Sequence, residues 1–514
     1  RPPAAGVPGD LGAVAYGMVD LPAAQSREPL LFDADRTGHL FIIGSSRSGR
    51  SQTLRTLAAA LSNRHSTADL HLYAIDCGNG ALLPLAGLPH CGAVVDRLQV
   101  ERLDRMLGWF TTELTRRQAM FGERGVADLT EQRRGAAAGQ RLPHLFLMVD
   151  RFEVFERDFA TYDNGSYLDR LARLLRDGAG VGVHVILAGD KVLGASRFAG
   201  ATEEKLVLRL NDRTDYSMVG LNSKDVPPEQ TPGRAIRLGD NAEAQIAVLG
   251  PDTSGQGQAA VLAEGARRIC DRDAGVPVAA RPRRFVALPD LVTYAEVSRS
   301  APAGARPLTA FVGVGGDEVV PLGPDLADIP TFAIGGPPRS GRSTALLTVA
   351  RSLLERGTGI LVVAPRRSPL RDLAGLPGVS AVVQDAGVAA TDFRKMLQSM
   401  PQDTGAVIVD DAELLAQSDI DGDLNTLARG AAGNGWGLVV AGNAEALSLG
   451  LAGWLTQLKR NRSGLLIAPQ SITDGELIGL RIPRGIIGQS GNPGRAYLHL
   501  GDGVLTAVQV PRAE

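Results

Sequence analysis

Two glycine-rich stretches contain the residues best suited to chemistry. The first runs from Gly44 to Ser51 (GSSRSGRS) and the second from Gly336 to Ser343 (GPPRSGRS), and both have glycine, four residues, glycine, a cation and a hydroxyl. Glycines allow backbone N–H groups to surround phosphate oxygens, and a following helix presents its positive N-terminus. The spacing predicts a phosphate-binding loop. A plain strand-to-helix turn is the alternative, which the repetition of the pattern disfavours.

The predicted ligand of both loops is ATP with Mg²⁺, because the serine hydroxyl that ends such a loop can ligate the metal. The residues expected to bind this cofactor are Gly44, Ser45, Ser46, Arg47, Ser48, Gly49, Arg50, Ser51 and Gln52 in the first loop, and Gly336, Pro337, Pro338, Arg339, Ser340, Gly341, Arg342, Ser343 and Thr344 in the second.

Arginine stands in both loops where lysine usually reaches the β- and γ-phosphates. Arg50 and Arg342 keep the charge and can bind phosphate through two hydrogen bonds, but guanidinium is bulkier and planar. Binding should tolerate this change better than catalysis. We therefore expect degenerate ATPase sites with weak or no hydrolysis.

Carboxylates end two later apolar runs. Asp150 follows HLFLMV and Asp410 follows AVIV, the position from which nucleotide-hydrolysing enzymes of this class hold Mg²⁺. The expected metal ligands are Ser51 with Asp150, and Ser343 with Asp410. Helix capping is the alternative for Asp150.

The residue after each aspartate often orients the attacking water. It is Arg151 in the first half, which cannot act as a base, and Asp411 in the second, which is the one catalytic residue we expect. Glu153 and Glu413 are alternatives for this role.

A polar residue also follows a later strand in each half, at Asp190 and Asn443. These are the expected sensors of the γ-phosphate. A turn-forming role is an equal alternative for both.

The same order of segments occurs twice along the 514 residues. A Pro- and Arg-rich connector, 279–307, separates the copies, and we expect two domains, 1–302 and 303–514. Short apolar runs alternate with helical patterns in each copy. This predicts an α/β fold for both copies, with mostly parallel sheets and terminal β-hairpins.

Composition limits the partners. Lys and Arg number 54 against 56 Asp and Glu, so no overall positive field attracts nucleic acid, although a local patch remains open. Three widely spaced cysteines fit a reducing compartment, and the seven histidines show no metal-ligand spacing. No apolar run is long enough to cross a bilayer. Because the chain begins at Arg1, we expect it to be a piece of a longer protein, whose membrane anchor can lie outside it.

These motifs resemble the FtsK/SpoIIIE branch of P-loop motor ATPases and, more narrowly, the tandem C-terminal ATPase domains of EccC from type VII secretion systems. The resemblance rests on GMVDLPAAQSREPLLFD before GHLFIIG, on RSGRS in both halves, on PGRA near each domain end, and on SGLLIAPQSITDGELIGLRIPRG. It covers nearly the whole chain, from about Tyr16 onward.

The resemblance implies that the two copies are tandem P-loop NTPase domains of the RecA/FtsK type, and that they are regulatory, nucleotide-binding domains in a secretion motor. It further implies an upstream ATPase domain and a membrane anchor as partners, with this part at the cytoplasmic face of the bacterial membrane. The last domain would recognise C-terminal signals of exported WXG-type substrates, and a ring-forming homo-oligomer is compatible with the family. No nucleic acid is expected.

Two other functions stay open. A fragment of an FtsK-like DNA translocase is disfavoured by the net charge of −2 and by the loop arginines. A peptide-binding module without nucleotide turnover is the second, with Trp454, Leu455 and Leu458 at helical spacing as groove residues. Core packing is the commoner reason for such spacing.

Overall fold

The computed structural model describes residues 11–137, 139–224, 226–227, 230–401, 404–449, 453–488 and 492–512. The chain divides into two compact units, Arg1–Phe285 and Val286–Glu514. The boundary expected before Ala303 therefore lies inside the second unit. The reason is local pairing, since Val286 N donates to Asp317 O at 2.8 Å and Arg512 N donates to Val292 O at 2.9 Å.

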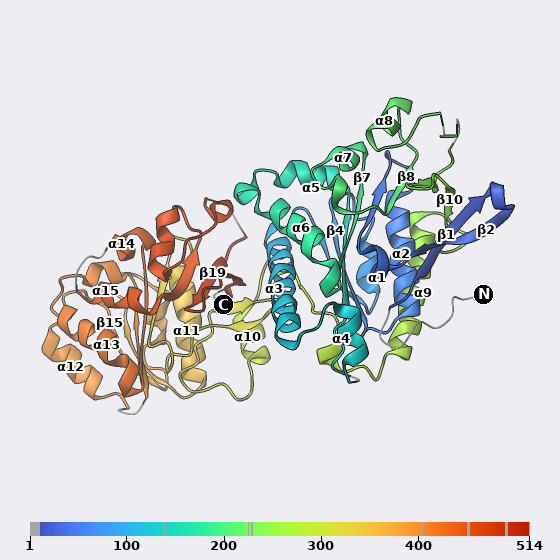
Figure 1. The fold of residues 1–514 in the computed structure, drawn as a ribbon. Coiled ribbons are helices and arrows are strands. Elements are labelled where there is room, and N and C mark those ends of the chain that lie inside the picture. The colour runs from blue at the N-terminus through green and yellow to red at the C-terminus, as the bar shows by residue number, and fades with distance from the viewer. Residues whose placement is uncertain are drawn as a thin grey trace. The chain divides into compact units, whose positions relative to one another are not determined.

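Over the described residues, each unit forms one ten-stranded sheet, and the strand order is the same in both. Helices pack against the sheet of each unit (Figure 1). In the first unit the order is β2-β1-β10-β9-β8-β3-β7-β6-β4-β5. The strands from β8 to β5 pair in parallel, whereas those from β8 to β2 pair antiparallel. The predicted α/β fold, with mostly parallel sheets and terminal hairpins, is confirmed.

The strands of the first unit are β1 (Val14–Leu21), β2 (Ser26–Phe32), β3 (Leu40–Ile43), β4 (Leu70–Asp76), β5 (Cys91–Asp96), β6 (His144–Asp150), β7 (Val183–Gly189), β8 (Lys205–Leu208), β9 (Arg234–Arg237) and β10 (Glu243–Ile246). Those of the second are β11 (Gly313–Gly315), β12 (Val320–Leu322), β13 (Thr331–Gly335), β14 (Gly359–Val363), β15 (Val379–Val383), β16 (Gly405–Val409), β17 (Trp436–Gly442), β18 (Ser463–Ile467), β19 (Arg495–Leu500) and β20 (Thr506–Gln509).

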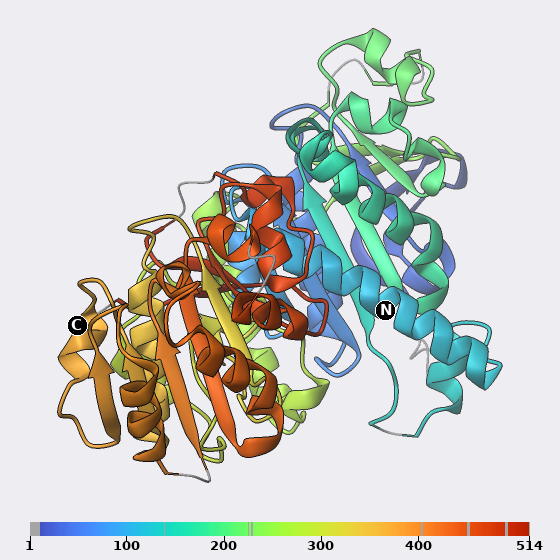
Figure 2. The ribbon, with the colours of Figure 1, turned by 90° about the vertical axis from the view of Figure 1, so that its left-hand side faces the viewer.

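Helices cover both faces of each sheet (Figure 2). In the part of the chain that is described, none is long and apolar enough to cross a bilayer. The helices of the first unit are α1 (Ala34–Thr37), α2 (Arg50–Arg64), α3 (Val100–Arg124), α4 (Leu129–Gly135), α5 (Phe152–Phe159), α6 (Ser166–Asp177), α7 (Lys191–Ala195), α8 (Arg213–Met218) and α9 (Gly255–Arg272). Those of the second are α10 (Tyr294–Ser300), α11 (Arg342–Glu355), α12 (Ala390–Gln398), α13 (Asp421–Asn434), α14 (Ala444–Leu449) and α15 (Trp454–Leu458).

The core of the first unit has two layers, because side chains alternate across each strand. Leu40 and Ile42 of β3 pack in the layer formed with α2 and α9. Phe41 and Ile43 pack in the layer formed with α3, α5 and α6. A strand buried on both faces must be apolar throughout, which is why the β3 segment reads LFII.

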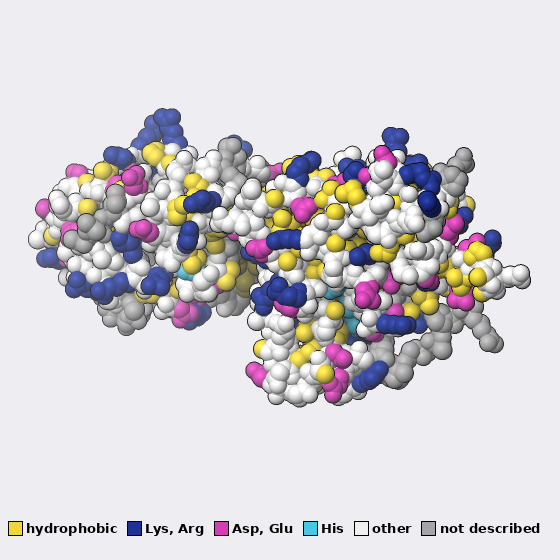
Figure 3. All heavy atoms as spheres, turned by 45° about the horizontal axis from the view of Figure 1, so that its top comes forward, with side chains coloured by type: hydrophobic (Ala, Val, Ile, Leu, Met, Phe, Trp, Pro, Cys, Tyr) yellow, Lys and Arg dark blue, Asp and Glu magenta, His cyan; other side chains and the backbone are white. Residues whose placement is uncertain are grey.

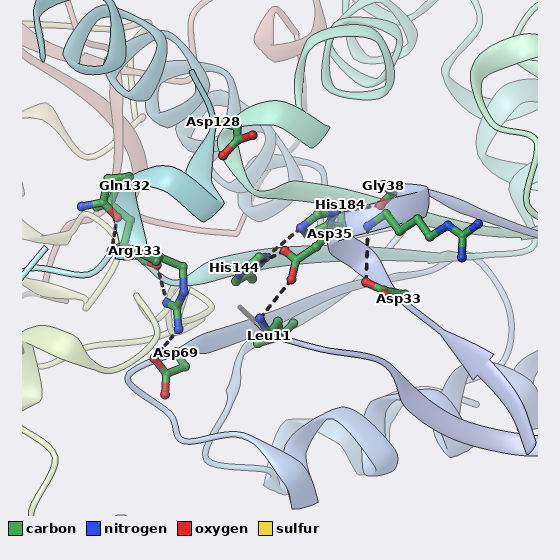
Figure 4. Close-up of polar contacts among 12 residues, drawn as sticks. Leu11, Asp33, Asp35, Gly38, Asp69, Asp128, Gln132, Arg133, His144 and His184 are labelled. Carbon is green, nitrogen blue, oxygen red and sulfur yellow. Dashed lines mark hydrogen bonds and ion pairs between the residues drawn. The ribbon is translucent and has the colours of Figure 1, made fainter. Parts of the chain in front are cut away.

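The amino ends of the parallel strands carry a histidine pair that sequence spacing does not reveal (Figure 4). His184 Nδ1 lies 2.8 Å from Gly38 O and must donate to it, so His184 Nε2 accepts from His144 Nδ1 at 3.0 Å. His144 Nε2 then faces Asp35 Oδ1 at 3.6 Å. The pair forms because β6 and β7 are neighbours. No group of three or more potential metal ligands occurs in the described ranges.

Candidate nucleotide-binding sites

Both predicted loops lie between a central parallel strand and a helix. The first joins β3 to α2 and the second joins β13 to α11. Gly49 and Gly341 precede their helices with φ of 114° and 102°, and Arg47 and Arg339 have φ of 60° and 63°. The two loops therefore use the left-handed region at matching positions, a conformation in which successive N–H groups can surround an anion.

The first glycine of each loop is required by close packing. A Cβ on Gly44 would lie 2.4 Å from Ser48 Oγ, and one on Gly336 would lie 2.6 Å from Ser340 Oγ. Any side chain at either position would displace the loop.

The first loop lines a cavity of about 540 Å³. Four arginines reach it, Arg47, Arg50, Arg55 and Arg151, which suits an anionic ligand. Gly44 and Ser48 lie outside the cavity wall. The loop residues in the wall are Ser45, Ser46, Arg47, Gly49, Arg50, Ser51 and Gln52.

The terminal hairpin supplies a second wall that the sequence prediction missed. Pro232 and Gly233, in the turn before β9, line the cavity together with Gln245 and Ile246 of β10. Gly233 N donates to Ser48 O at 2.8 Å and ties this turn to the loop. The repeated PGR sequence was the available signal.

The metal-ligand pair expected in the first unit is assembled. Ser51 Oγ donates to Asp150 Oδ2 at 2.6 Å. Burial raises the pKa of Asp150, while the Ser51 hydroxyl opposes this shift and the neighbouring Asp76 carboxylate adds to it. A hydroxyl beside a carboxylate is a donor set that fits a hard divalent cation.

Arg50 does not point freely into the cavity. Its Nη1 and Nη2 donate to the two carboxylate oxygens of Glu153 at 3.3 and 3.1 Å. Such two-point ion pairs are the strong kind, and only 9% of the Arg50 side chain is exposed. Glu153, one of the candidates for orienting water, thus neutralises the loop cation instead.

The second unit repeats this neutralisation more loosely. Arg342 Nη1 donates to Gly336 O at 3.1 Å, and Nη2 donates to Asp411 Oδ1 at 3.4 Å. Glu413 Oε1 is 4.0 Å away from Nη1. Burial raises the pKa of Asp411, as do the Asp410 and Glu413 carboxylates, whereas the Arg342 guanidinium lowers it.

The metal-ligand pair expected in the second unit is not assembled. Asp410 Oδ2 accepts a hydrogen bond from Ser368 Oγ at 2.7 Å. No hydrogen bond of the described residues joins the Ser343 hydroxyl to Asp410. The donor set for a divalent cation is therefore present in the first unit but not in the second.

The cavity of the second unit is larger, about 840 Å³. Its loop residues are Arg339, Ser340, Gly341 and Thr344. The connector lines it as well, through Asp290 and Leu291. The remaining predicted loop residues lie outside this wall: Gly336, Pro337, Pro338, Arg342 and Ser343.

The predicted sensors both cap helices. Asp190 Oδ1 accepts from Val192 N at 2.8 Å, and Asn443 Oδ1 accepts from Ala446 N at 3.1 Å. Their own N–H groups donate to Glu153 and Glu413, respectively, at 3.2 Å. The turn-forming role is thus present in both, and sensing of phosphate remains a prediction.

The suggested peptide groove around Trp454 is wrong. Trp454, Leu455 and Leu458 are all buried in the core of the second unit. Their helical spacing reflects core packing, so they are not available to a partner.

This fold and these loops define a tandem pair of P-loop NTPase domains, a class that binds nucleotide with a divalent metal. The profile of the FtsK/SpoIIIE family matches residues 13–198, which lie in the first unit. The chain is similar to the ESX secretion system protein EccC of Thermomonospora curvata, with 29% identity over an aligned length of 444, which covers 80% of this chain and 32% of that protein. It therefore spans about a third of the length of that curated relative.

Two solved structures have the same fold as this chain. EssC of Geobacillus thermodenitrificans (ATPases 2 and 3) is 21% identical and superposes with a TM-score of 0.72 over 100% of this chain and 98% of that one. Thermomonospora curvata EccC (ATPases 2 and 3), in complex with a signal sequence peptide, is 23% identical with a TM-score of 0.65, over 100% and 95% of the two chains.

Proposed function

We propose that both units bind ATP as a stable ligand and hydrolyse it weakly or not at all. The observation that carries this proposal is that each loop arginine is paired with a carboxylate of the following strand-end segment, Arg50 with Glu153 and Arg342 with Asp411. Hydrolysis of the nucleotide requires a loop cation on the phosphates and a carboxylate that orients the attacking water. These ion pairs engage both groups with each other.

Groups other than the loop arginines Arg50 and Arg342 support nucleotide binding. Backbone N–H groups of the loops and the N-termini of α2 and α11 attract phosphate. Arg47 and Arg151 line the first cavity without being engaged as Arg50 is. At Ser51 and Asp150, Mg²⁺ would supply charge neutralisation for the phosphates. A bound nucleotide stabilises the fold by mass action.

The test is to purify the chain, count the bound nucleotide and measure ATP turnover. We expect bound nucleotide with turnover near background. Robust turnover that is lost in Asp150→Ala would contradict the proposal for the first unit, and the same result with Asp411→Ala would contradict it for the second.

We further propose that the two units are regulatory domains of a type VII secretion motor. The similarity to EccC and EssC proteins supports this, and an upstream ATPase domain and a membrane anchor are the implied partners at the cytoplasmic face of the membrane. A ring-forming homo-oligomer is a further part of the proposal. Analytical ultracentrifugation of the chain with and without ATP tests self-association.

A nucleic-acid partner is not part of this proposal. The net charge is −2, and Lys and Arg side chains lie among Asp and Glu on the face drawn in Figure 3. Tight binding of duplex DNA that weakens steeply with salt would instead support a DNA translocase.

The second unit is the proposed recognition site for C-terminal signals of WXG-type substrates. A related EccC structure holds a signal sequence peptide, which supports the proposal. Titration of the chain with a substrate C-terminal peptide tests it, with the reversed peptide as control. Cross-links from the peptide confined to the first unit would contradict it.

A further inference from the structure

The strand-end aspartates of the two units accept different hydroxyls. Asp150 Oδ2 accepts from Ser51 of the phosphate loop at 2.6 Å. Asp410 Oδ2 accepts at 2.7 Å from Ser368, which lies in the turn after β14. Ser368 therefore has, on Asp410, the position that the loop serine has on Asp150.

The other oxygen of each aspartate is used identically. Asp150 Oδ1 accepts from Arg151 N at 3.0 Å, and Asp410 Oδ1 accepts from Asp411 N at 3.1 Å. The two carboxylates thus have the same orientation at the end of β6 and β16. The two units therefore differ in which serine donates to the aspartate, and not in how the aspartate is oriented.

The turn after the adjacent strand explains the exchange. In the first unit Asp76 ends β4 beside Asp150 and accepts from Gly78 N and Leu82 N, both at 2.8 Å. The second unit has the apolar Ala364 at the corresponding position, directly after β14. A different side chain must order the turn there.

Ser368 takes over that task. It caps the short 3₁₀ helix Pro369–Leu373 by accepting from Leu370 N at 3.3 Å. Its one hydroxyl hydrogen is donated to Asp410, and both residues are buried. This bond holds the Asp410 carboxylate on Ser368, and among the described residues no hydrogen bond joins it to the Ser343 hydroxyl of the loop, so a cation at Asp410 would lack the loop hydroxyl as its second ligand.

We propose that the second unit binds its nucleotide without a divalent cation, whereas the first unit binds nucleotide together with Mg²⁺. The inference rests on the proposed binding of nucleotide at both loops. Arginines supply the positive charge in the second cavity, which Arg339, Arg495 and Arg512 line. Guanidinium groups bind phosphate oxygens directly and do not need a bridging metal.

The experiment counts nucleotide and metal on the full chain. The chain is saturated with ATPγS and Mn²⁺, bound nucleotide is measured by chromatography after denaturation, and free Mn²⁺ is measured by electron paramagnetic resonance. We expect two nucleotides and one Mn²⁺ per chain. Asp150→Asn should remove the Mn²⁺, and Asp410→Asn should leave it.

Ser368→Ala is the more direct test, because it removes the hydroxyl that donates to Asp410. It should raise bound Mn²⁺ from one to two per chain. Ser368→Thr keeps the hydroxyl and should leave one. Two Mn²⁺ on the unaltered chain, reduced to one by Asp410→Asn, would overturn the inference, as would Ser368→Ala that folds and still binds one. Fewer than two nucleotides would count against the proposed function, and absence of nucleotide from the second loop would overturn both.

Discussion

The two phosphate loops have the same backbone but different surroundings. Gly49 and Gly341 adopt nearly the same φ, and both units place an aspartate at the end of the neighbouring strand. In the first unit that aspartate holds the loop serine, and the loop arginine has a two-point ion pair. In the second unit Ser368 holds the aspartate, and the arginine shares looser partners.

This difference shows that a loop motif specifies the backbone shape of a phosphate site but not its ion pairs or its metal ligands. Those depend on side chains that reach the loop from the ends of neighbouring strands. At the ends of two neighbouring strands the first unit has Asp76 beside Asp150, whereas the second has Ala364 beside Asp410, with Ser368 bonded to that aspartate. Two copies of one motif can thus have different metal requirements.

The largest expected contrast between the units is in their response to acid. Six of the seven histidines lie in the first unit. Burial lowers the pKa of His39, His65, His71 and His90 to about 4. Burial also lowers the pKa of His184, to about 3, and that of His144 well below its ordinary value.

Proton uptake by the unfolded chain decides whether the free energy of unfolding rises or falls with pH. Below a pH of about 6.5 these histidines take up protons when unfolded but remain neutral when folded, so stability is lost as pH falls from about 6.5 towards 4. Each such proton contributes about 1.4 kcal/mol per pH unit. The raised pKa of Asp150 acts in the opposite sense, but Asp411 does the same in the second unit.

Hydrogen exchange, read separately from peptides of the two units at pH 7 and pH 5, measures this contrast. We expect the free energy of opening to fall for the first unit by several kcal/mol more than for the second. Equal losses in both units would show that the histidines do not set the difference.

The second contrast concerns the loop arginines. Glu153→Gln removes the partner of a largely buried guanidinium and should lower the stability of the first unit by about 3 kcal/mol. Asp411→Asn should cost the second unit about 1 kcal/mol, because Arg342 keeps its bond to Gly336 O. Unfolding in urea, followed by hydrogen exchange in peptides of each unit, compares the two variants.

The same substitution should change ligand binding in the opposite direction. Glu153→Gln releases Arg50 towards phosphate, so ATP affinity should rise while stability without nucleotide falls. An ATP affinity that falls with Glu153→Gln would show that Arg50 supports the loop only through this ion pair.

The third contrast tests the backbone. Alanine is strained at the positive φ of both Gly49 and Gly341, at a cost of about 1–2 kcal/mol. A Cβ on Gly49 would also lie 3.0 Å from Gly233 N, whereas none of the surrounding atoms lies within 4 Å of one on Gly341. Gly49→Ala should therefore lower the Tm of its unit more than Gly341→Ala does. A larger loss from Gly341→Ala would contradict the tie between hairpin turn and loop.

Much of this arrangement is predictable from sequence because it depends on local patterns. The loops, the strand-end aspartates and the duplicated strand order all follow from spacing and apolar alternation. The Ser368–Asp410 bond does not, because it joins residues 42 positions apart and depends on the register of β14 against β16. The boundary at Phe285 and the hairpin wall of the first cavity depend on tertiary packing in the same way.

Side-chain direction is the other part that spacing cannot supply. Glu153 was a candidate for orienting water, yet it binds Arg50 and accepts from Asp190 N. Trp454 has the spacing of a groove residue, yet it lies in the core. A pattern gives the position of such residues on an element but not the neighbour they meet.

The smallest expected effect comes from making the first site resemble the second at the position after the aspartate. Arg151 and Asp411 have φ of 56° and 46°, so both use the left-handed region, which aspartate adopts more readily than arginine. Arg151→Asp should thus change stability by less than about 0.5 kcal/mol. It should weaken ATP binding, since it replaces a cation that lines the cavity. ATP turnover should stay at background, because Glu153 still forms its ion pair with Arg50. Phosphate release by Arg151→Asp, compared with release by the Glu153→Gln/Arg151→Asp double variant, checks this. Turnover gained by Arg151→Asp alone would show that hydrolysis in the first unit is limited by the absence of a water-orienting carboxylate at position 151 and not by the ion pair of Arg50.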